Sequence, residues 1–307
     1  MTAILFSTST FNLDFVPDRT DLERAGIELR INPFRRKLTE DEAAHLLADG
    51  VVGVVAGLEP LTARVLESAR SLRAIARVGI GLDSVDLNAA RRLGIEVMNT
   101  PDPPARAVAE LTLGHILSLL RRISLVDRRL HEGTWTPEMG SLLSGRTVGF
   151  VGFGRIGRRL ARLLEPFEVT ILVNDPAADD VSHERTDLDD LLRRSHVVTL
   201  HVPYAPDTHH LIDADRLATM RSDAILVNVA RGGLVDEEAL ATAIDTGTIA
   251  GAALDCFAEE PYHGPLAGME RVQMTAHMGT YARETRDQME REAATQIVDF
   301  LRRLGAL

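Results

Sequence analysis

Short apolar segments of strand length alternate with longer segments of helical periodicity from one end of the chain to the other. This alternation is typical of βα units, in which helices cover both faces of a parallel sheet. The expected strands fall into two series. The first series comprises residues 3–6, 27–31, 51–56, 74–78 and 96–98. The second comprises residues 147–153, 169–174, 197–202, 224–229, 249–255 and 271–275.

Each series predicts its own doubly wound parallel sheet, so we expect two α/β lobes. The six strands of the second series lie within about 130 residues, which matches a complete dinucleotide-binding domain of the Rossmann type. Residues 103–131 are expected to form one long joining helix. Its nearly uniform apolar character predicts that it is covered by the lobes or by a second subunit. Residues 284–304 are expected to form a helix that returns to the first lobe.

Composition restricts the class of protein. Hydrophobic residues make up 45% of the chain and charged residues 26%, as in an ordinary globular protein. The net charge of −11 argues against an extended nucleic-acid surface. No apolar run reaches the length of about 18 residues that spans a membrane, and the N-terminal segment lacks the basic residues of a signal peptide, so a cytoplasmic location is expected. Cys256 is the only cysteine, so neither an intrachain disulfide nor a cysteine-built zinc site is expected, and no metal is predicted.

The strongest local signal is a glycine-rich turn in the second series. An apolar strand leads into Gly152-Phe-Gly154-Arg-Ile-Gly157, and a helix-forming stretch, residues 158–164, follows. The first glycine permits a tight turn, the second lets the backbone approach a pyrophosphate, and the third lets helix and strand pack closely. The N–H groups at the helix N-terminus would then face the phosphates of a dinucleotide.

An acidic residue stands at the end of the next expected strand. Asp175 lies 23 positions after Gly152. A carboxylate there accepts hydrogen bonds from the hydroxyl groups of the adenosine ribose, and its charge repels the 2′-phosphate of NADP. The sequence therefore predicts NAD as the cofactor. The alternatives are that Asp175-Pro176 only forms a turn, or that the glycine-rich turn and the acid belong to a methyltransferase.

Three further strand ends carry side chains suited to hydride transfer. Arg231 follows the fourth expected strand of the second series, where an arginine can hold a carboxylate through two charge-assisted hydrogen bonds. Glu259 and Glu260 follow the fifth strand, and His277 follows the sixth. A histidine paired with a carboxylate is a proton donor near neutral pH. Each of these residues also fits a plain structural interpretation, as a surface arginine, an acidic turn before a proline or a loop histidine.

Together with the glycine-rich turn, these segments resemble the D-isomer-specific 2-hydroxyacid dehydrogenases. The resemblance covers nearly the full length through Ala76-Arg-Val-Gly-Ile-Gly-Leu-Asp-Ser-Val-Asp86, Asn99-Thr-Pro101, Ala107-Val-Ala-Glu-Leu-Thr112, Leu200-His-Val-Pro203 with Thr208, Asn228-Val-Ala-Arg-Gly-Gly-Leu-Val-Asp-Glu237, Asp255-Cys-Phe-Ala-Glu-Glu-Pro261 and Thr275-Ala-His-Met-Gly279. The segment Ala56-Gly-Leu-Glu-Pro60 and the chain length resemble the phosphoglycerate-dehydrogenase-like branch.

The resemblance implies a discontinuous substrate domain with a flavodoxin-like fold, made of residues 1–99 and 281–307. It implies a Rossmann NAD-binding domain, residues 100–280, inserted into the first. The implied activity is hydride transfer between NAD(H) and a D-2-hydroxy acid or its 2-keto acid. The implied assembly is a homodimer joined through the nucleotide domains, with neither nucleic acid nor a membrane as a partner.

The resemblance also implies roles for individual residues. Arg231 binds the carboxylate and carbonyl of the substrate, His277 donates the proton, and Glu260, which directly precedes the proline of its motif, is the partner of His277. The implied cofactor site consists of Gly152, Gly154, Arg155, Ile156, Gly157, Asp175, His201, Val202, Pro203, Thr208, Val229, Ala230, Asp255 and Gly279. The implied substrate site of the other lobe consists of Gly57, Leu58, Arg77, Val78 and Gly79. Backbone groups of its last two residues would hold the substrate carboxylate.

The sequence leaves the substrate open. A phosphorylated or otherwise dianionic acid such as 3-phosphoglycerate is one interpretation, because Arg77 or Arg106 could bind a second anionic group. Arg77 fits a structural salt bridge equally well. Glyoxylate, hydroxypyruvate, a phosphonate and formate are the other substrates considered. Because the chain ends at Leu307, no C-terminal regulatory domain, and hence no feedback control by serine through one, is expected.

A binding protein on the same scaffold is the alternative from another class. Corepressors that sense NAD(H) share this fold, but a sensor needs no proton donor, so Arg231, Glu260 and His277 favour an enzyme. Two positions depart from the family pattern. Asp102-Pro-Pro104 stands where a glycine and small polar residues are common, and Ala276 replaces a frequent proline.

Overall fold

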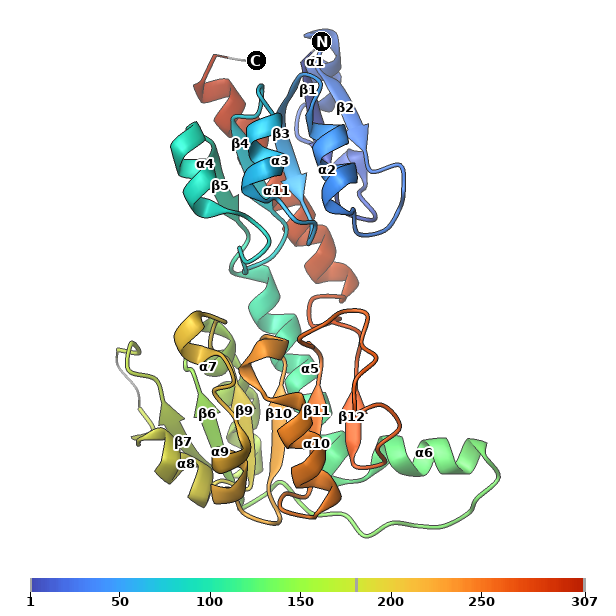
Figure 1. Ribbon diagram of the computed structural model, residues 1–307, viewed down its shortest axis with the longest axis vertical. Helices are drawn as coiled ribbons and strands as arrows, with labels where there is room; N and C mark the ends of the chain where they lie inside the picture. Colours follow the sequence, from blue (N-terminus) through green and yellow to red (C-terminus); the bar gives the residue numbers. More distant parts are fainter. Residues whose placement is uncertain (1, 180–181, 306–307) are drawn as a thin grey trace. The chain divides into compact units, whose positions relative to one another are not determined.

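The structure is a computed structural model that describes residues 2–179 and 182–305, and these fold as two compact units (Figure 1). Unit 1 comprises Met1–Pro104 and Thr280–Leu307, and unit 2 comprises Ala105–Gly279. The division expected from the sequence lies at 99/100 and 280/281. The functional roles assigned to the two parts stay predictions.

Unit 1 is built on a five-stranded parallel sheet in the order β2-β1-β3-β4-β5, which is the flavodoxin-like order. Its strands are β1 (Ala3–Phe6), β2 (Glu28–Ile31), β3 (Val51–Ala56), β4 (Ala74–Arg77) and β5 (Glu96–Asn99). Its helices are α1 (Arg19–Arg24), α2 (Glu40–Leu47), α3 (Ala63–Ser68), α4 (Leu87–Leu93) and α11 (Arg283–Arg303), with a 3₁₀ turn at Leu13–Phe15. The inner strands β1, β3 and β4 are buried on both faces, which explains their continuous apolar sequences.

The C-terminal helix α11 returns to unit 1, as the sequence predicted. Its buried residues belong to one hydrophobic core with α1 and the sheet, while α2, α3 and α4 share the core on the opposite face. Gly53 of β3 lies directly under α11, because a Cβ atom there would be 2.9 Å from Cγ2 of Ile297. Two segments at opposite ends of the chain therefore form one layered domain.

Unit 2 is built on a seven-stranded parallel sheet in the order β12-β11-β10-β9-β6-β7-β8. This is the Rossmann order with one strand added beyond the sixth. Its strands are β6 (Thr147–Val151), β7 (Thr170–Asn174), β8 (Glu184–Arg185), β9 (Val197–Leu200), β10 (Ile225–Asn228), β11 (Gly251–Leu254) and β12 (Val272–Met274). The sequence predicted all but β8, a two-residue strand whose residues are both exposed, so no apolar run marked it.

The helices of unit 2 cover both faces of this sheet. They are α5 (Pro103–Leu120), α6 (Ile123–His131), α7 (Arg155–Leu164), α8 (Leu188–Arg194), α9 (Ala214–Thr219) and α10 (Glu237–Asp245). Three 3₁₀ turns lie at Glu165–Phe167, Pro206–Thr208 and Gly232–Leu234. Helices α5 and α7 share the core on one face, and α8, α9 and α10 share the core on the other. Every helix of the described residues is too short or too polar to cross a membrane.

The expectation of one helix over residues 103–131 was wrong. The helix breaks at Arg122, which adopts the left-handed conformation with φ 57°. A left-handed residue cannot continue a right-handed helix. The carbonyl of Leu120 instead accepts a hydrogen bond of 2.7 Å from the backbone N–H of Ser141. The apolar residues of α5 pack into the core of unit 2, so no second subunit is needed to cover them.

The departure at Asp102-Pro-Pro104 has a local explanation. Pro103 is the first residue of α5. A proline suits this position because the first helical N–H has no partner within the helix and the fixed φ of proline is already helical. The two prolines are buried and begin the helix.

Candidate functional site

The predicted cofactor and catalytic residues of unit 2 lie after the carboxyl ends of its strands. In a parallel sheet these ends share one edge, which is where doubly wound folds bind their ligands. The segments are residues 152–157 after β6, Asp175 after β7, residues 201–203 after β9, residues 229–231 after β10, residues 255–260 after β11 and residues 277–279 after β12. Thr208 ends the 3₁₀ turn that follows β9.

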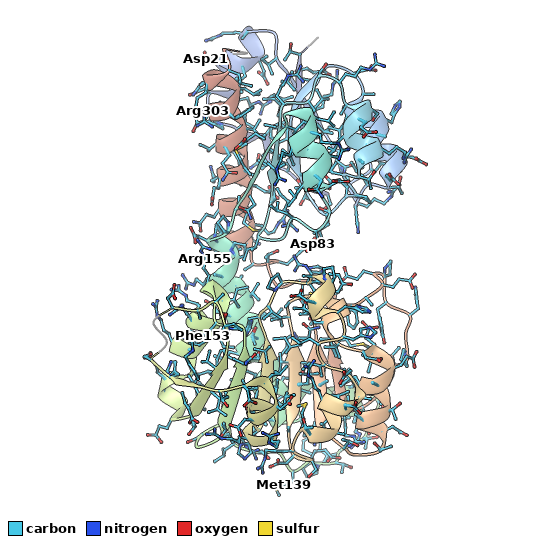
Figure 2. The ribbon with its side chains drawn as sticks, turned by 60° about the vertical axis from the view of Figure 1, so that its left-hand side comes forward. Asp21, Asp83, Met139, Phe153, Arg155 and Arg303 are labelled. Carbon is cyan, nitrogen blue, oxygen red and sulfur yellow. The ribbon has the colours of Figure 1, made fainter. Side chains whose placement is uncertain are left out.

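The glycine-rich turn between β6 and α7 is tightly packed at its first and third glycines. Phe153 and Arg155 mark its position in Figure 2. Gly152 has φ 91°, and a Cβ atom on it would lie 2.6 Å from the carbonyl oxygen of His201. A Cβ atom on Gly157 would lie 2.9 Å from the carbonyl oxygen of Gly152.

Gly154 differs from these two glycines. It is exposed at the N-cap of α7, and nothing lies within 4 Å of where its Cβ atom would be. Its lack of a side chain therefore leaves open space over the first turn of a ten-residue helix. The sequence-based prediction places a dinucleotide phosphate in this open space at the N-terminus of the helix.

Asp175 closes the other side of the same turn. Its Oδ2 atom accepts a hydrogen bond of 2.7 Å from the backbone N–H of Phe153, and its Oδ1 atom accepts one of 2.9 Å from Ala177. A carboxylate has about four acceptor positions, so two remain for ribose hydroxyl groups. Asp175 thus shapes the glycine-rich turn, and its contact with the ribose of NAD stays a prediction.

The structure brings His277 and Glu260 together. The Nδ1 atom of His277 lies 2.9 Å from Oε2 and 3.0 Å from Oε1 of Glu260. The two side chains are 29% and 32% exposed, so both reach solvent. Oε1 of Glu260 also accepts the backbone N–H of Phe257 at 3.1 Å, which fixes the carboxylate. Glu259, the other acid considered from the sequence, instead lines a pocket beside the N-terminus of α10, which is described below.

Asp255 holds the turn that carries His277. The carbonyl of Asp255 accepts the N–H of His277, and its carboxylate accepts the N–H groups of Met278 and Gly279, all at 2.8 Å. His277 has φ 49°, a left-handed conformation that is uncommon for a residue with a side chain. Because Asp255 is fully buried, these hydrogen bonds do not compete with water and stabilise that conformation.

Arg231 projects from a turn that its own neighbours brace. The buried Asn228 side chain donates to the carbonyl of Arg231 at 2.8 Å and accepts the N–H of Ala230 at 3.1 Å. The Nη1 atom of Arg231 donates to the carbonyl of Ala230 at 2.6 Å. Gly232 packs directly on the backbone of Phe257 and so joins this turn to the loop that carries Glu260. Arg231, Glu260 and His277 therefore stand on three neighbouring strand ends.

One group among the described residues combines three side chains able to bind a metal ion, namely Cys256, Glu260 and His277, whose ligand atoms lie within 4.8 Å of one another. The sequence predicted no metal. Burial raises the pKa of the Cys256 thiol, which keeps the sulfur protonated at neutral pH. In the structure the histidine and the carboxylate of this group bind each other.

Residues after β9 line the back of the glycine-rich turn. Nε2 of His201 and the hydroxyl of Thr199 form a hydrogen bond of 2.9 Å. Burial lowers the pKa of His201 to about 3, so its ring is neutral. Val202 contacts the turn, since its Cγ1 atom would lie 2.9 Å from a Cβ atom on Gly152. The hydroxyl of Thr208 accepts the N–H of Ala205 at 2.8 Å and so shapes the loop that follows.

Gly57 and Leu58, predicted to bind substrate, follow β3 in unit 1. The N–H of Gly57 donates to both carboxylate oxygens of Glu59, at 3.0 and 3.1 Å. Glu59 is 2% exposed and also accepts the hydroxyl of Ser7. The backbone donor of Gly57 is thus already engaged within unit 1, whereas Leu58 is exposed.

The other predicted substrate residues of unit 1 follow β4. The N–H of Val78 donates to the carbonyl of Ala56 at 2.8 Å, and the N–H of Gly79 donates to Oγ1 of Thr100 at 2.8 Å. A substrate carboxylate would have to share or replace these hydrogen bonds. Arg77 is 7% exposed, and its Nη1 atom donates to the carbonyl of Val78.

Comparison with known proteins identifies the family. Residues 113–279 match the NAD binding domain of the D-isomer specific 2-hydroxyacid dehydrogenases. The hydroxypyruvate reductase of Thermotoga maritima is 37% identical over 289 residues, which cover 90% of this chain and 94% of that protein. The chain belongs to this family. It is an NAD-dependent oxidoreductase of the D-2-hydroxyacid dehydrogenase type.

Two further relatives differ in how much of their own length matches this chain. The D-3-phosphoglycerate dehydrogenase of Methanocaldococcus jannaschii is 38% identical over 274 residues, which cover 86% of this chain and 52% of that protein. The chain thus spans about half the length of that relative. The D-lactate dehydrogenase of Aquifex aeolicus, solved with NAD and lactic acid, is 26% identical, covers 97% of this chain and 95% of its own, and superposes with a TM-score of 0.85.

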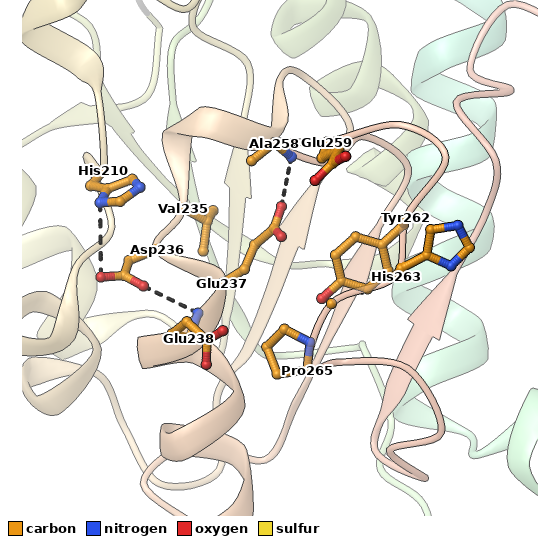
Figure 3. A pocket seen from close by; sticks show the side chains of 11 residues that line it. His210, Val235, Asp236, Glu237, Glu238, Ala258, Glu259, Tyr262, His263 and Pro265 are labelled. Carbon is orange, nitrogen blue, oxygen red and sulfur yellow. Dashed lines mark hydrogen bonds and ion pairs between the residues drawn. The ribbon is translucent and has the colours of Figure 1, made fainter.

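This D-2-hydroxyacid dehydrogenase also has a pocket that the sequence did not indicate (Figure 3). It is an acidic cavity of about 340 Å³ beside the N-terminus of α10, lined by His210, Val235, Asp236, Glu237, Glu238, Ala258, Glu259, Tyr262, His263, Gly264 and Pro265. Burial raises the pKa of Glu237, whose carboxylate accepts the N–H of Ala258 at 2.8 Å. Through this hydrogen bond Glu237 anchors the loop that carries Glu260.

Proposed function

We propose that the protein reduces a 2-keto acid to its D-2-hydroxy acid with NADH, and catalyses the reverse reaction with NAD. The observation that carries this proposal is the contact of 2.9 Å between His277 and Glu260, one strand end away from Arg231. A histidine fixed by a carboxylate and an arginine are the groups that proton exchange and carboxylate binding need.

The chemistry divides among the three side chains. Bound NADH supplies the hydride. Glu260 accepts the hydrogen on Nδ1 of His277, so Nε2 is the nitrogen that exchanges a proton with the substrate oxygen. The positive guanidinium of Arg231 holds the substrate carboxylate and polarises its carbonyl. In the oxidative direction His277 accepts the proton that it donates during reduction.

The preferred substrate class is a small 2-keto acid with a single carboxylate, such as hydroxypyruvate or glyoxylate. A phosphorylated acid such as 3-phosphoglycerate would need a second cationic group. Arg77 is buried and donates to the carbonyl of Val78, and Arg106 forms an ion pair of 2.9 Å with Glu110. Both arginines predicted from the sequence for that purpose are therefore engaged within the chain.

The assembly we propose is a homodimer joined through unit 2. The apolar side chains exposed on α6 and on the segment after it are Ile123, Leu130, Trp135, Met139 and Leu142. Trp135 is 84% exposed and Met139 is 92% exposed. Met139 lies at the end of unit 2 opposite Arg155 (Figure 2). Five exposed large apolar side chains within one stretch of about 20 residues favour contact with a second copy of the chain rather than with water.

The proposal is tested by following NADH absorbance with hydroxypyruvate, glyoxylate, pyruvate, phosphohydroxypyruvate and phosphonopyruvate. We expect the single-carboxylate acids to have higher kcat/KM values than the phosphorylated acid. His277→Ala should lower kcat by about 10² to 10⁴-fold, because the proton donor is lost, while the Kd of NADH stays unchanged. His209→Ala, an exposed histidine outside the site, is the matched control. Turnover that survives in His277→Ala, or no NADH consumption with any of the acids, would contradict the proposal.

A further inference from the structure

A chain of hydrogen bonds runs from the body of unit 2 to the turn that carries His277. Nε2 of Gln273 lies 2.9 Å from Nδ1 of His115, and Nε2 of His115 lies 3.2 Å from Oγ1 of Thr275. The hydroxyl of Thr275 then donates to Oδ1 of Asp255 at 2.6 Å. His115 and Thr275 are 160 positions apart, on α5 and directly after β12, so only the fold brings them together.

The donors and acceptors of this chain have one consistent direction. The amide of Gln273 is oriented by Ser124, whose hydroxyl donates to its Oε1 atom at 3.2 Å, so its nitrogen faces His115. His115 therefore accepts at Nδ1 and carries its hydrogen on Nε2, which donates to Thr275. Because Thr275 accepts from the ring, its own hydrogen is directed to Asp255. The donor and acceptor roles in each hydrogen bond therefore determine those in the next one.

The environment keeps the imidazole of His115 neutral. The residue is 1% exposed, and burial lowers its pKa, although the negative charge of Asp255 acts in the opposite direction. A proton on Nδ1 would face the amide hydrogens of Gln273, so the hydrogen-bond pattern also excludes the charged form. The chain is thus a fixed, neutral link rather than a route for charge.

The chain ends on the carboxylate that holds the catalytic turn. Oδ1 of Asp255 receives Thr275 and the N–H of Met278, and Oδ2 receives the N–H of Gly279. The hydroxyl of Thr275 therefore sets the orientation of the same carboxylate whose other hydrogen bonds keep His277 in its left-handed conformation. The ring of His277 can meet Glu260 only while that turn is in place.

We propose that His115 and Thr275 are positioning residues that hold the proton donor His277 in register with Glu260 through Asp255. This inference rests on the proposed function, because the orientation of His277 affects turnover only if His277 exchanges the proton with the substrate. Neither side chain touches the substrate or cofactor in this role. They act through Asp255 and the turn to Gly279, which also belong to the implied cofactor site. Their effect should therefore be larger on the chemical step than on the Kd of NADH.

Thr275→Val and Thr275→Ser form the decisive pair, because valine keeps the shape of threonine without the hydroxyl and serine keeps the hydroxyl. We expect Thr275→Val to lower kcat by about tenfold, since a displacement of ~1 Å at a reacting group costs about a hundredfold. The KM of the keto acid should change by less than about twofold, and the Kd of NADH should change by a smaller factor than kcat, because the main effect is on the orientation of His277. Thr275→Ser should restore kcat. Thr295→Val, at an exposed position of α11, is the matched control.

A second pair tests the other end of the chain. His115→Leu removes the donor to Thr275, whereas His115→Gln keeps both an acceptor for Gln273 and a donor for Thr275. We expect the leucine variant to lose kcat and the glutamine variant to keep most of it. Hydrogen exchange of the Met278 and Gly279 amides, measured by NMR, should become faster in Thr275→Val and His115→Leu only. This measurement reports the stability of the turn independently of any catalytic assay.

Two results would overturn the positioning role. One is a Thr275→Val enzyme with the kcat and the amide protection of the wild type, measured beside an inactive His277→Ala enzyme. The other is equal impairment of Thr275→Val and Thr275→Ser, because the hydroxyl would then not be the group that matters. Full turnover of His277→Ala would instead contradict the proposed function, so the two failures are distinguishable.

Discussion

Gly232 and Phe257 approach each other so closely that a Cβ atom on the glycine would lie 1.8 Å from the carbonyl carbon of Phe257. The contact joins the turn after β10, which carries Arg231, to the loop after β11, which carries Glu260. No side chain mediates it, so the spacing of Arg231 and Glu260, the two side chains that we propose act in catalysis, depends on backbone packing. Gly232 has an ordinary backbone conformation, so a glycine is required here because it has no side chain rather than because of its φ angle.

Gly232→Ala should therefore damage both stability and catalysis. The methyl group must separate the two loops, and overpacking of this kind costs about 1–3 kcal/mol of the free energy of unfolding. Arg231 and Glu260 would move apart with the loops, so kcat/KM should fall by at least about tenfold. Urea unfolding and steady-state kinetics provide the measurement.

The matched control for this change is Gly114→Ala. Gly114 lies within α5, and nothing is within 4 Å of where its Cβ atom would be. Alanine at such a helical position should raise the free energy of unfolding by about 0.5–1 kcal/mol and leave turnover unchanged. A Gly232→Ala enzyme as stable and active as Gly114→Ala would show that the loops separate without consequence.

Asp175→Ala should relax the preference for NADH. The change removes the charge that repels a 2′-phosphate and the acceptor for the ribose hydroxyl groups. It also removes the acceptor of the Phe153 N–H, so NADH should bind more weakly. The ratio of kcat/KM with NADPH to that with NADH should rise by about tenfold or more, equivalent to about 1.4 kcal/mol. Asp189→Ala, at an exposed position of α8, should leave the ratio unchanged. A wild-type enzyme that uses both cofactors equally would contradict this interpretation of Asp175.

His115 should make stability depend on pH near neutrality. Burial lowers its pKa in the folded protein below the ordinary value of 6.5. Between these two pKa values the unfolded chain binds the proton more readily than the folded protein does. The stabilisation is therefore fully present above about pH 6.5 and is lost as the pH falls toward the folded pKa.

The measurement is urea unfolding of the wild type and His115→Gln between about pH 5 and 8, the range in which histidine titrates. The free energy of unfolding of the wild type should fall more steeply toward low pH than that of the variant. His131→Gln, whose side chain is 82% exposed, is the control and should keep the wild-type dependence. Parallel curves for wild type and His115→Gln would mean that His115 is not held in its neutral form.

The exposed apolar residues after α5 should control oligomeric state. Replacing Ile123, Trp135 and Met139 by serine removes apolar surface that we expect a second copy to bury. Light scattering after size exclusion should then show a monomer in place of a dimer, with unit 2 still folded by circular dichroism. A triple serine substitution at the exposed Ile31, Phe34 and Leu87 of unit 1 is the matched control. A wild type that is monomeric at all concentrations would contradict the proposed homodimer.

The sequence by itself determined the two series of strands, their burial and the glycine-rich turn. These features depend on neighbours within a few positions, where apolar periodicity and the conformational freedom of glycine act directly. The same short range explains the errors. No glycine or proline near Arg122 marked the break in the helix, and the exposed strand β8 had no apolar pattern to detect.

Only the tertiary structure decided how the strand ends meet. It brought Glu260, the partner that the family resemblance implied, to within hydrogen-bonding distance of His277. It also engaged the backbone donors of Val78 and Gly79 within unit 1 and placed His115 against Thr275. These relationships join residues that are distant in the chain, and each depends on the directions of individual donors and acceptors. Periodicity along a sequence reports which face of an element is buried, but the partner of a buried polar group is set by whatever the fold packs against it.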